Sequence, residues 1–187
     1  IAEDNNDVRS FLASTLKHNY DVVEFADGSD ALHSMVEDIP DLIISDIMMP
    51  GMDGLTLCNN VKSAESTNHI PVILLTARAS EAHQVEGLST GADAYISKPF
   101  NTKILELTIK NLLVAKEIMR EKFSQQLVSQ PSNIPLDSPE EKFVAKLMAI
   151  IEAKMDNPEF DVNVLVTEIG MSRSVLYKKV QTLTSYS

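Results

Sequence analysis

The stretch LIISDIMMPGMDG, residues 42–54, decides the fold class. Its opening residues are apolar and partly β-branched without a break, which is typical of a strand covered by helices on both faces of a parallel sheet. Asp46 follows this strand directly, at the edge where ligands gather in open sheets of this kind. The stretch therefore predicts a central strand with a functional residue at its tip.

Similar segments recur through the first part of the chain. Residues 21–25, 72–75 and 94–96 have strand character, and they alternate with segments of helical spacing such as 8–16 and 31–36. Ser80 is a plausible cap for a further helix that ends near Gly87 and Gly91. We predict an α/β fold of about five βα units, with a doubly wound five-stranded parallel sheet.

Composition limits the possible functions. The chain of 187 residues has a net charge of −11, and residues 1–138 carry 20 acids and 10 bases, whereas residues 139–187 carry 7 and 6. An acidic chain has no overall electrostatic attraction to nucleic acid, so any contact with DNA must be local. The single Cys58 excludes internal disulfides. No apolar run approaches the ~20 residues of a membrane helix, so we expect no direct membrane contact.

Polar residues follow the expected strands at one edge of the sheet. They are Glu3, Asp4, Asp46, Thr76 and Lys98. Three carboxylates without histidine or cysteine form a hard oxygen site that suits Mg²⁺. Beside such an ion Asp46 is a plausible nucleophile toward phosphorus, and it would form an acyl phosphate. Lys98 and Thr76 could then contact the phosphoryl oxygens.

The segments IAEDN, LIISDIMMPGMDG, VILLTAR and GADAYISKPF resemble, in order and spacing, the receiver domains of two-component response regulators. The resemblance covers residues 1–124 and implies a flavodoxin-like fold. By this resemblance Asp46 is the phosphoacceptor. Asp4, Asp46 and the backbone carbonyl of Met48 are the Mg²⁺ ligands, and Glu3 assists them. Thr76 and Tyr95 form a switch pair, and Lys98-Pro99 is a cis peptide.

The chain itself is not expected to be an enzyme. It has no GxxxxGK[ST] phosphate loop, so the resemblance implies a histidine kinase as phosphoryl donor. A haloacid-dehalogenase-like phosphatase is excluded because Met48 stands where the second acid of a DxD motif would be.

Residues 101–127 contain no glycine or proline and predict one long helix. Apolar residues recur close to heptad spacing, at Leu105, Ile109, Leu112, Met119 and Phe123, although Lys116 interrupts the pattern. Two interpretations stay open, an ordinary packed helix and a helix that also pairs with a second copy. The second would make the phosphorylated protein a homodimer.

A linker is expected at residues 125–138, followed by a small all-α domain at residues 139–187. Ser138-Pro139 can begin a helix that runs through Met155. Asp161 can cap a second helix, Gly170 makes a turn, and Ser172 can cap a third. This is a helix-turn-helix pattern, with a small helical adaptor as the alternative.

The stretch IGMSRSVLYKKVQTLT resembles the first helix-turn-helix of AraC-type regulators. The resemblance implies that Ser174, Tyr177 and Lys178 read bases, and we expect Arg173 and Lys179 near the phosphate backbone. A complete domain of that family has a second helix-turn-helix. We therefore expect this chain alone to bind DNA weakly or not at all.

The order of these parts resembles the C-terminal end of hybrid two-component sensors, which carry their own histidine kinase. Because the chain begins at Ile1 within a motif, we expect a longer parent protein, of which this part is cytoplasmic. On the hybrid interpretation the parent would be a sensor of the inner membrane. A stand-alone regulator is the other possibility. Two functions remain open: phosphorylation-controlled DNA binding and transcription, and a phosphorelay receiver that acts through protein contacts with the helical domain as adaptor.

Overall fold

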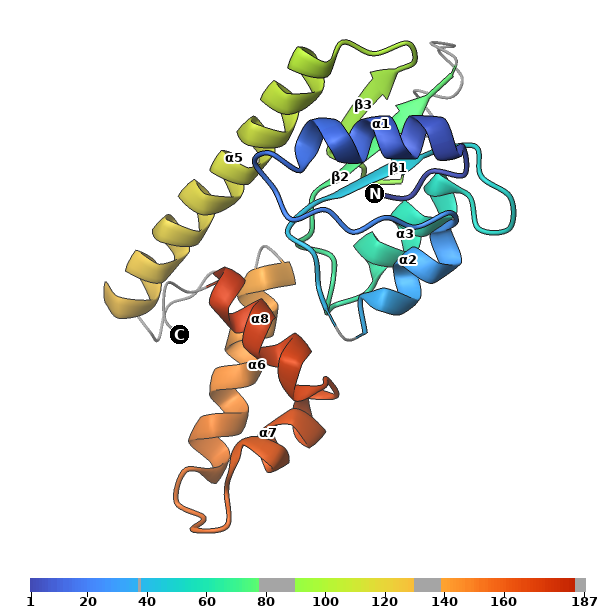
Figure 1. Cartoon of the computed structure of the whole chain (residues 1–187). Coiled ribbons are helices and arrows are strands. Elements are labelled where there is room, and N and C mark those ends of the chain that lie inside the picture. The colour runs from blue at the N-terminus through green and yellow to red at the C-terminus, as the bar shows by residue number, and fades with distance from the viewer. Residues whose placement is uncertain (37, 78–89, 130–138, 184–187) are drawn as a thin grey trace. The chain divides into compact units, whose positions relative to one another are not determined.

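The computed structural model describes residues 1–36, 38–77, 90–129 and 139–183, and the chain divides into two compact units (Figure 1). One unit comprises residues 1–35 and 40–115, and the other comprises residues 36–39 and 116–187. Each has its own hydrophobic cluster. No helix in the described ranges combines the length and apolarity that a membrane crossing requires.

A parallel sheet forms the centre of the first unit. Strands β1 (Ile43–Asp46), β2 (Val72–Thr76) and β3 (Ala94–Ser97) pair in this order. Every residue of β1 and β2 is buried. The prediction of central strands covered on both faces is therefore confirmed for these two segments.

Two more segments join the sheet through single residues. Ala2 forms parallel bridges with Phe25 and with Ser45, and its amide donates to the carbonyl of Ile44 at 2.9 Å. The expected strand at residues 21–25 is wrong in extent: Val23 and Phe25 exchange backbone hydrogen bonds with Ile1 and Glu3, but residues 21–23 lie, in the parallel register of Ala2 with Phe25, opposite positions before Ile1. In the described ranges three of the five expected strands form as strands, and the other two are bridges.

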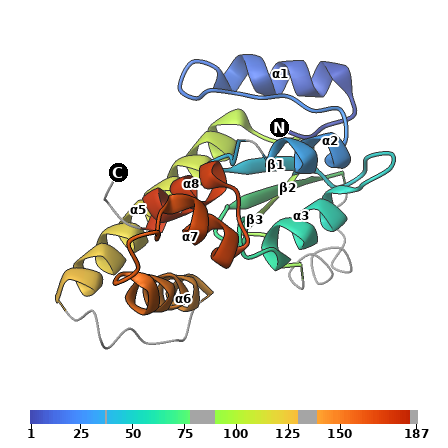
Figure 2. The same cartoon turned by 90° about the horizontal axis from the view of Figure 1, so that it is seen from below.

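Helices cover both faces of the sheet (Figures 1 and 2). Helix α1 (Asn6–Leu16) and the first part of α5 (Thr102–Ser129) pack on one face, where Leu12, Leu16, Leu105 and Ile109 meet strand residues in one cluster. On the other face lie α2 (Gly28–Ser34) and α3 (Gly54–Ser63), which contact each other. The doubly wound arrangement is confirmed, while the helix expected after Ser80 lies outside the described residues.

Besides the part of α5 from residue 116 onward, the described part of the second unit contains α6 (Pro139–Lys154), α7 (Val162–Ile169) and α8 (Arg173–Leu183). Asp161 accepts hydrogen bonds from the amides of Asn163 and Val164, and thereby caps α7. Gly170 ends α7 with a left-handed φ of 78°, which glycine adopts without strain. The oxygen Oγ of Ser172 accepts from the amide of Val175 at 3.3 Å. These predicted boundaries are confirmed.

Helix α5 differs from the prediction in length and in its buried face. It continues to Ser129, so residues 125–129 are helical although they were assigned to the linker. Residues 130–138, including Ser138, and the side chain of Phe123 lie outside the described part. Leu105 and Ile109 are buried in the first unit. The expected heptad seam is therefore wrong for its first half, because these residues face the sheet.

Candidate functional site

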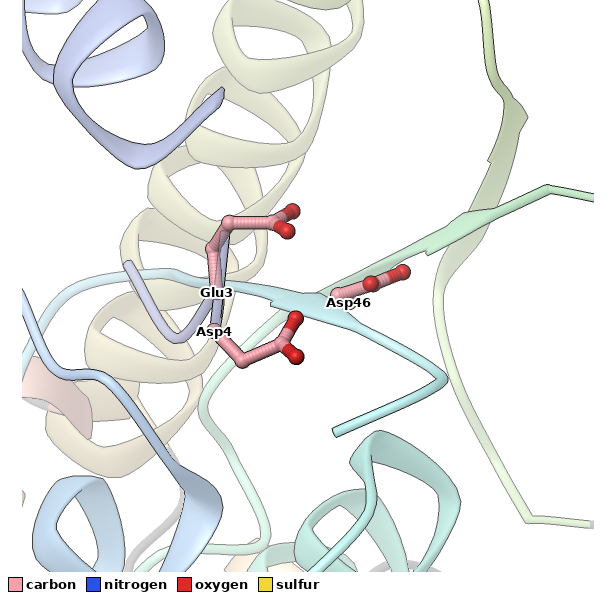
Figure 3. Close-up of side chains that lie close together, drawn as sticks. All are labelled: Glu3, Asp4 and Asp46. Atoms are coloured by element: carbon pink, nitrogen blue, oxygen red, sulfur yellow. The ribbon is translucent and has the colours of Figure 1, made fainter. Parts of the chain in front are cut away.

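Three carboxylates gather beyond the end of β1 (Figure 3). Glu3 and Asp4 lie in the turn before α1, and Asp46 is the last residue of β1. One oxygen from each of the three lies within 4.8 Å of the others. Glu3 and Asp46 are buried, whereas Asp4 is exposed and opens the cluster to solvent. This all-carboxylate donor set fits a hard divalent ion such as Mg²⁺.

Lys98 follows β3 and lies between two of these carboxylates. Its Nζ is 2.7 Å from Oε2 of Glu3 and 3.1 Å from Oδ2 of Asp46. Burial lowers the pKa of Lys98, but the hydrogen bonds to Glu3 and Asp46 outweigh burial, and the resulting pKa is raised. The ammonium therefore stays charged. The Lys98–Pro99 peptide is cis, as the resemblance implied.

Glu3 is held in an unfavourable position for a charged carboxylate. Burial raises the pKa of Glu3, the hydrogen bond from Lys98 lowers it in part, and the negative charge of Asp46 raises it further. The net pKa is above that of an ordinary glutamate. A cation added to the cluster would relieve this repulsion.

Arg9 in α1 fixes the backbone of the acidic turn. Its Nη1 donates to the carbonyl oxygens of Glu3 at 2.6 Å and of Asp4 at 3.3 Å, and its Nη2 donates to Oδ1 of Asn6 at 2.8 Å. Asn5 caps α1 by accepting from two amides of the first turn. Sequence reasoning missed Arg9. The available signal was an arginine one helical turn after the cap that follows the two acids.

The start of α3 presses directly against the end of β1. A Cβ atom on Gly54 would lie 2.1 Å from the carbonyl oxygen of Asp46, so only glycine fits there. The carboxylate of Asp53 accepts from the amide of Thr56 at 2.7 Å and caps α3. The last two residues of the opening motif thus set the position of Asp46.

Thr76 and Tyr95 lie on neighbouring strands. Thr76 is buried at the end of β2, and the amide of Lys98 donates to its carbonyl oxygen at 2.7 Å. The hydroxyl of Tyr95 lies 3.2 Å from Oγ1 of Thr90. Burial raises the pKa of Tyr95, so the hydroxyl remains protonated at neutral pH. Met48 follows Asp46 by two residues, and its side chain is exposed.

The predicted DNA-contacting residues divide into two groups. Arg173, Ser174 and Tyr177 are exposed on α8, and Lys178 is half-buried. Lys179 is fully buried, and its ammonium lies 4.7 Å from the centroid of the Phe143 ring. The expectation that Lys179 lies near a phosphate backbone is therefore wrong, because a buried cation over an aromatic ring belongs to the core.

A doubly wound parallel sheet with carboxylates and a lysine at its strand ends defines an α/β protein that acts at the carboxyl edge of the sheet. Residues 1–110 match the family of the response regulator receiver domain, and the chain belongs to this family. Receiver domains of two-component systems are phosphoacceptors that bind Mg²⁺, with which the cluster of Glu3, Asp4 and Asp46 is consistent.

Two relatives show how far along the chain the similarity extends. Histidine kinase P4 of Formosa agariphila is 42% identical over 187 residues, which are 100% of this chain and 14% of that protein. The phosphate regulon transcriptional regulatory protein PhoB of Escherichia coli (strain K12) is 40% identical over 114 residues, 60% of this chain and 50% of PhoB. The chain thus spans half or less of both relatives.

A solved structure supports the fold. It is the signal receiver domain of a signal transduction histidine kinase from Syntrophus aciditrophicus, with 32% identity, a TM-score of 0.58, and coverage of 73% of this chain and 96% of that chain. The family match ends at residue 110, so it does not extend to α6, α7 and α8.

Proposed function

We propose that this chain is a phosphorylation-controlled regulator of transcription. In this proposal Asp46 receives a phosphoryl group from a histidine kinase, and the modification controls sequence-specific DNA binding by the second unit. The convergence of Glu3, Asp4, Asp46 and Lys98 at one sheet edge is the observation that carries the proposal.

Each residue of the cluster has a distinct role in the transfer. A carboxylate oxygen of Asp46 attacks phosphorus as the bond to the donor breaks, and an acyl phosphate results. Asp4, Asp46 and the backbone carbonyl of Met48 would hold Mg²⁺, with Glu3 assisting, and the bound ion would neutralise negative charge during the transfer. Lys98 is close enough to Asp46 to contact a phosphoryl oxygen placed there.

Thr76 and Tyr95 would transmit the change. The hydroxyl of Thr76 would donate to the phosphoryl group, and the ring of Tyr95 would follow it inward. Because Tyr95 lies in β3, this movement would alter the surface that β3 forms with α5. The buried position of Thr76 at the end of β2 supports this role.

We assign the DNA contacts to Arg173, Ser174, Tyr177 and Lys178, and three of these are exposed on the helix after the Gly170 turn. Similarity to Histidine kinase P4 along the whole chain supports a C-terminal position within a hybrid histidine kinase. We place this part of the parent protein in the cytoplasm. Two copies would associate as a homodimer on phosphorylation.

The phosphorelay function with a helical adaptor remains the second candidate. Burial of Lys179 favours it, since Arg173 and Lys178 are then the remaining bases in the described part of α8 that could contact DNA.

Acetyl phosphate and Mg²⁺ test the phosphoacceptor by intact-mass measurement. We expect one added phosphoryl group on the wild-type chain and none on Asp46→Asn. Equal labelling of both would contradict the assignment.

DNA binding of a longer chain with both helix-turn-helix motifs, measured by fluorescence anisotropy with and without acetyl phosphate, then separates the two candidate functions. Unchanged DNA affinity would favour the relay.

A further inference from the structure

Asp4 is the exposed carboxylate of the acidic cluster, and Arg9 holds the backbone on both sides of it. Glu3 and Asp46 are buried, and Lys98 contacts both of them. For Asp4, the described part of the chain supplies a single hydrogen bond, from Nη1 of Arg9 to the backbone carbonyl at 3.3 Å. The same nitrogen donates to the carbonyl of Glu3 at 2.6 Å. Because peptide units are planar, fixing the two units that flank Asp4 also fixes the direction of its side chain.

Arg9 is itself held in place by helix α1. Its Nη2 donates to Oδ1 of Asn6 at 2.8 Å, which orients the guanidinium plane. Leu12 and Leu16 of the same helix are buried in the hydrophobic cluster of the first unit. The acidic turn is therefore attached to the sheet through Arg9 and α1.

The guanidinium of Arg9 makes this attachment without pairing to the carboxylates. Arginine forms its strongest hydrogen bonds with carboxylates, and two of them belong to the residues that Arg9 contacts. Arg9 nevertheless donates to the backbone carbonyls of Glu3 and Asp4. In the described ranges no donor contacts the carboxylate of Asp4, so this group can bind a cation without first losing a partner.

We propose that Arg9 is a positioning residue for the divalent cation, because it directs the carboxylate of Asp4 toward Asp46 before the ion binds. One oxygen from each of Glu3, Asp4 and Asp46 lies within 4.8 Å of the others (Figure 3). Like charges this close repel, and an exposed aspartate that was free to turn would move into water. Orienting Asp4 in advance removes this rearrangement from binding, so Arg9 should strengthen Mg²⁺ binding. The inference rests on the Mg²⁺ site of the proposed function.

The charge of Arg9 acts in the opposite direction. A guanidinium cation beside the cluster repels a divalent cation bound there. If Arg9 acted through its charge alone, its removal would strengthen Mg²⁺ binding. If it acts by positioning, its removal weakens Mg²⁺ binding. The two roles differ in sign, so a measured dissociation constant separates them.

Mg²⁺ titration of the full chain, followed by backbone-amide NMR shifts at constant ionic strength, tests the inference. Arg9→Gln removes the charge and the paired nitrogens, and we expect the dissociation constant to rise roughly tenfold. Arg9→Lys keeps the charge, but its single nitrogen cannot reach all of the acceptors of Arg9, so we expect a similar rise. The matched control is Lys17→Gln, which removes the same charge at the end of the same helix, where Lys17 pairs with Glu24. It should change the dissociation constant by less than about twofold.

Asn6→Ala tests the same attachment with every charge left in place. It removes the acceptor of Nη2 and should raise the dissociation constant about threefold, since one hydrogen bond of the guanidinium is lost. This variant decides the question if substitution of Arg9 prevents folding. Urea unfolding in a chelator accompanies each titration, because a purely structural role would lower stability and leave the Mg²⁺ affinity of the folded chain unchanged.

Four results would overturn the inference: an unchanged or lower dissociation constant in Arg9→Gln, full recovery in Arg9→Lys, an equal rise in Lys17→Gln, or no change in Asn6→Ala. The wild-type titration distinguishes this failure from that of the proposed function. If the wild-type chain binds no Mg²⁺, the proposed site fails and the inference with it. If the wild type binds Mg²⁺ and the variants bind it equally well, only the role of Arg9 fails.

Discussion

Glu3 and Lys98 show how burial and charge oppose each other within the acidic cluster. Glu3 is 1% exposed and would lose much of its hydration on ionising. Lys98 compensates in part through a hydrogen bond of 2.7 Å. The pKa of Glu3 nevertheless stays raised, so folding and the protonation of this residue are coupled.

In the metal-free protein, Glu3 should make folding stability decrease as pH rises through its raised pKa. The raised pKa means that the folded state holds the proton more tightly than the unfolded state. The stabilising contribution of the bound proton is fully present below the ordinary pKa of glutamate. It is lost once the pH exceeds the raised pKa that Glu3 has in the folded protein. Urea unfolding at a series of pH values in a chelator, compared between wild type and Glu3→Gln, measures it. Identical pH profiles would refute the electrostatic account.

Lys179 is a second residue whose role depends on burial. Lys179→Ala should lower the free energy of unfolding by about 2 kcal/mol, because the cation–π contact with Phe143 and the packing of the aliphatic stem are lost. Lys178→Ala, the matched neighbour, should change it by less than about 0.5 kcal/mol. Denaturant unfolding of both variants measures these free energies. A similar cost for the two substitutions would mean that Lys179 is not part of the core.

At the residue scale the sequence predicted the acidic cluster, but it did not predict the burial of Lys179. Parallel strands place their carboxyl ends at one edge, so Glu3, Asp4 and Asp46 had to lie near one another. The helix-turn-helix pattern led us to expect Lys179 near a DNA phosphate backbone. Its spacing of three residues from Leu176 was the contrary signal, because such residues share one face of a helix.

At the scale of elements, the junction of β1 with α3 fixes the geometry of Asp46. The amide of Gly54 donates to the carbonyl of Ile47 at 3.0 Å, and Gly54 leaves no room for a side chain beside Asp46. A side chain at position 54 would therefore separate the start of α3 from the strand end that carries the proposed phosphoacceptor.

Gly54→Ala should destabilise the protein by about 2 kcal/mol or more, because the added methyl group collides with backbone and cannot be relieved by a rotamer change. It should also slow labelling by acetyl phosphate. Gly51→Ala is the control: no atom lies within 4 Å of its Cβ, so it should cost only about 1 kcal/mol for its left-handed φ of 75°. Comparable unfolding energies and unchanged labelling would contradict a close junction.

Element types followed from local sequence, whereas extents and faces depended on tertiary pairing. The capping residues Asp161 and Ser172 predicted where their helices begin, because capping is a local interaction. The strand expected at residues 21–25 is reduced to a bridge at Phe25, because the parallel register with Ala2 places residues 21–23 opposite positions before Ile1. In α5 the heptad and the ordinary 3.6-residue periodicities are too similar to separate by pattern, and only packing on the sheet identifies the buried face.

At the scale of the whole molecule, α5 is continuous across the division between the two units at residues 115 and 116. The proposed switch residue Tyr95 lies in β3, the strand that precedes this helix. A change at the acidic cluster thus has a covalent and helical route toward the part of the chain that we propose binds DNA.

Fluorine NMR with beryllofluoride, a phosphoryl mimic, tests most directly whether this cluster accepts a phosphoryl group with Mg²⁺. The wild-type chain should show bound fluoride resonances for one beryllofluoride per chain, and only when Mg²⁺ is present. Asp46→Asn should show none, because the oxygen that coordinates beryllium is missing. A folded wild-type chain that binds no beryllofluoride with Mg²⁺ in excess, or binding that survives Asp46→Asn, would contradict the account.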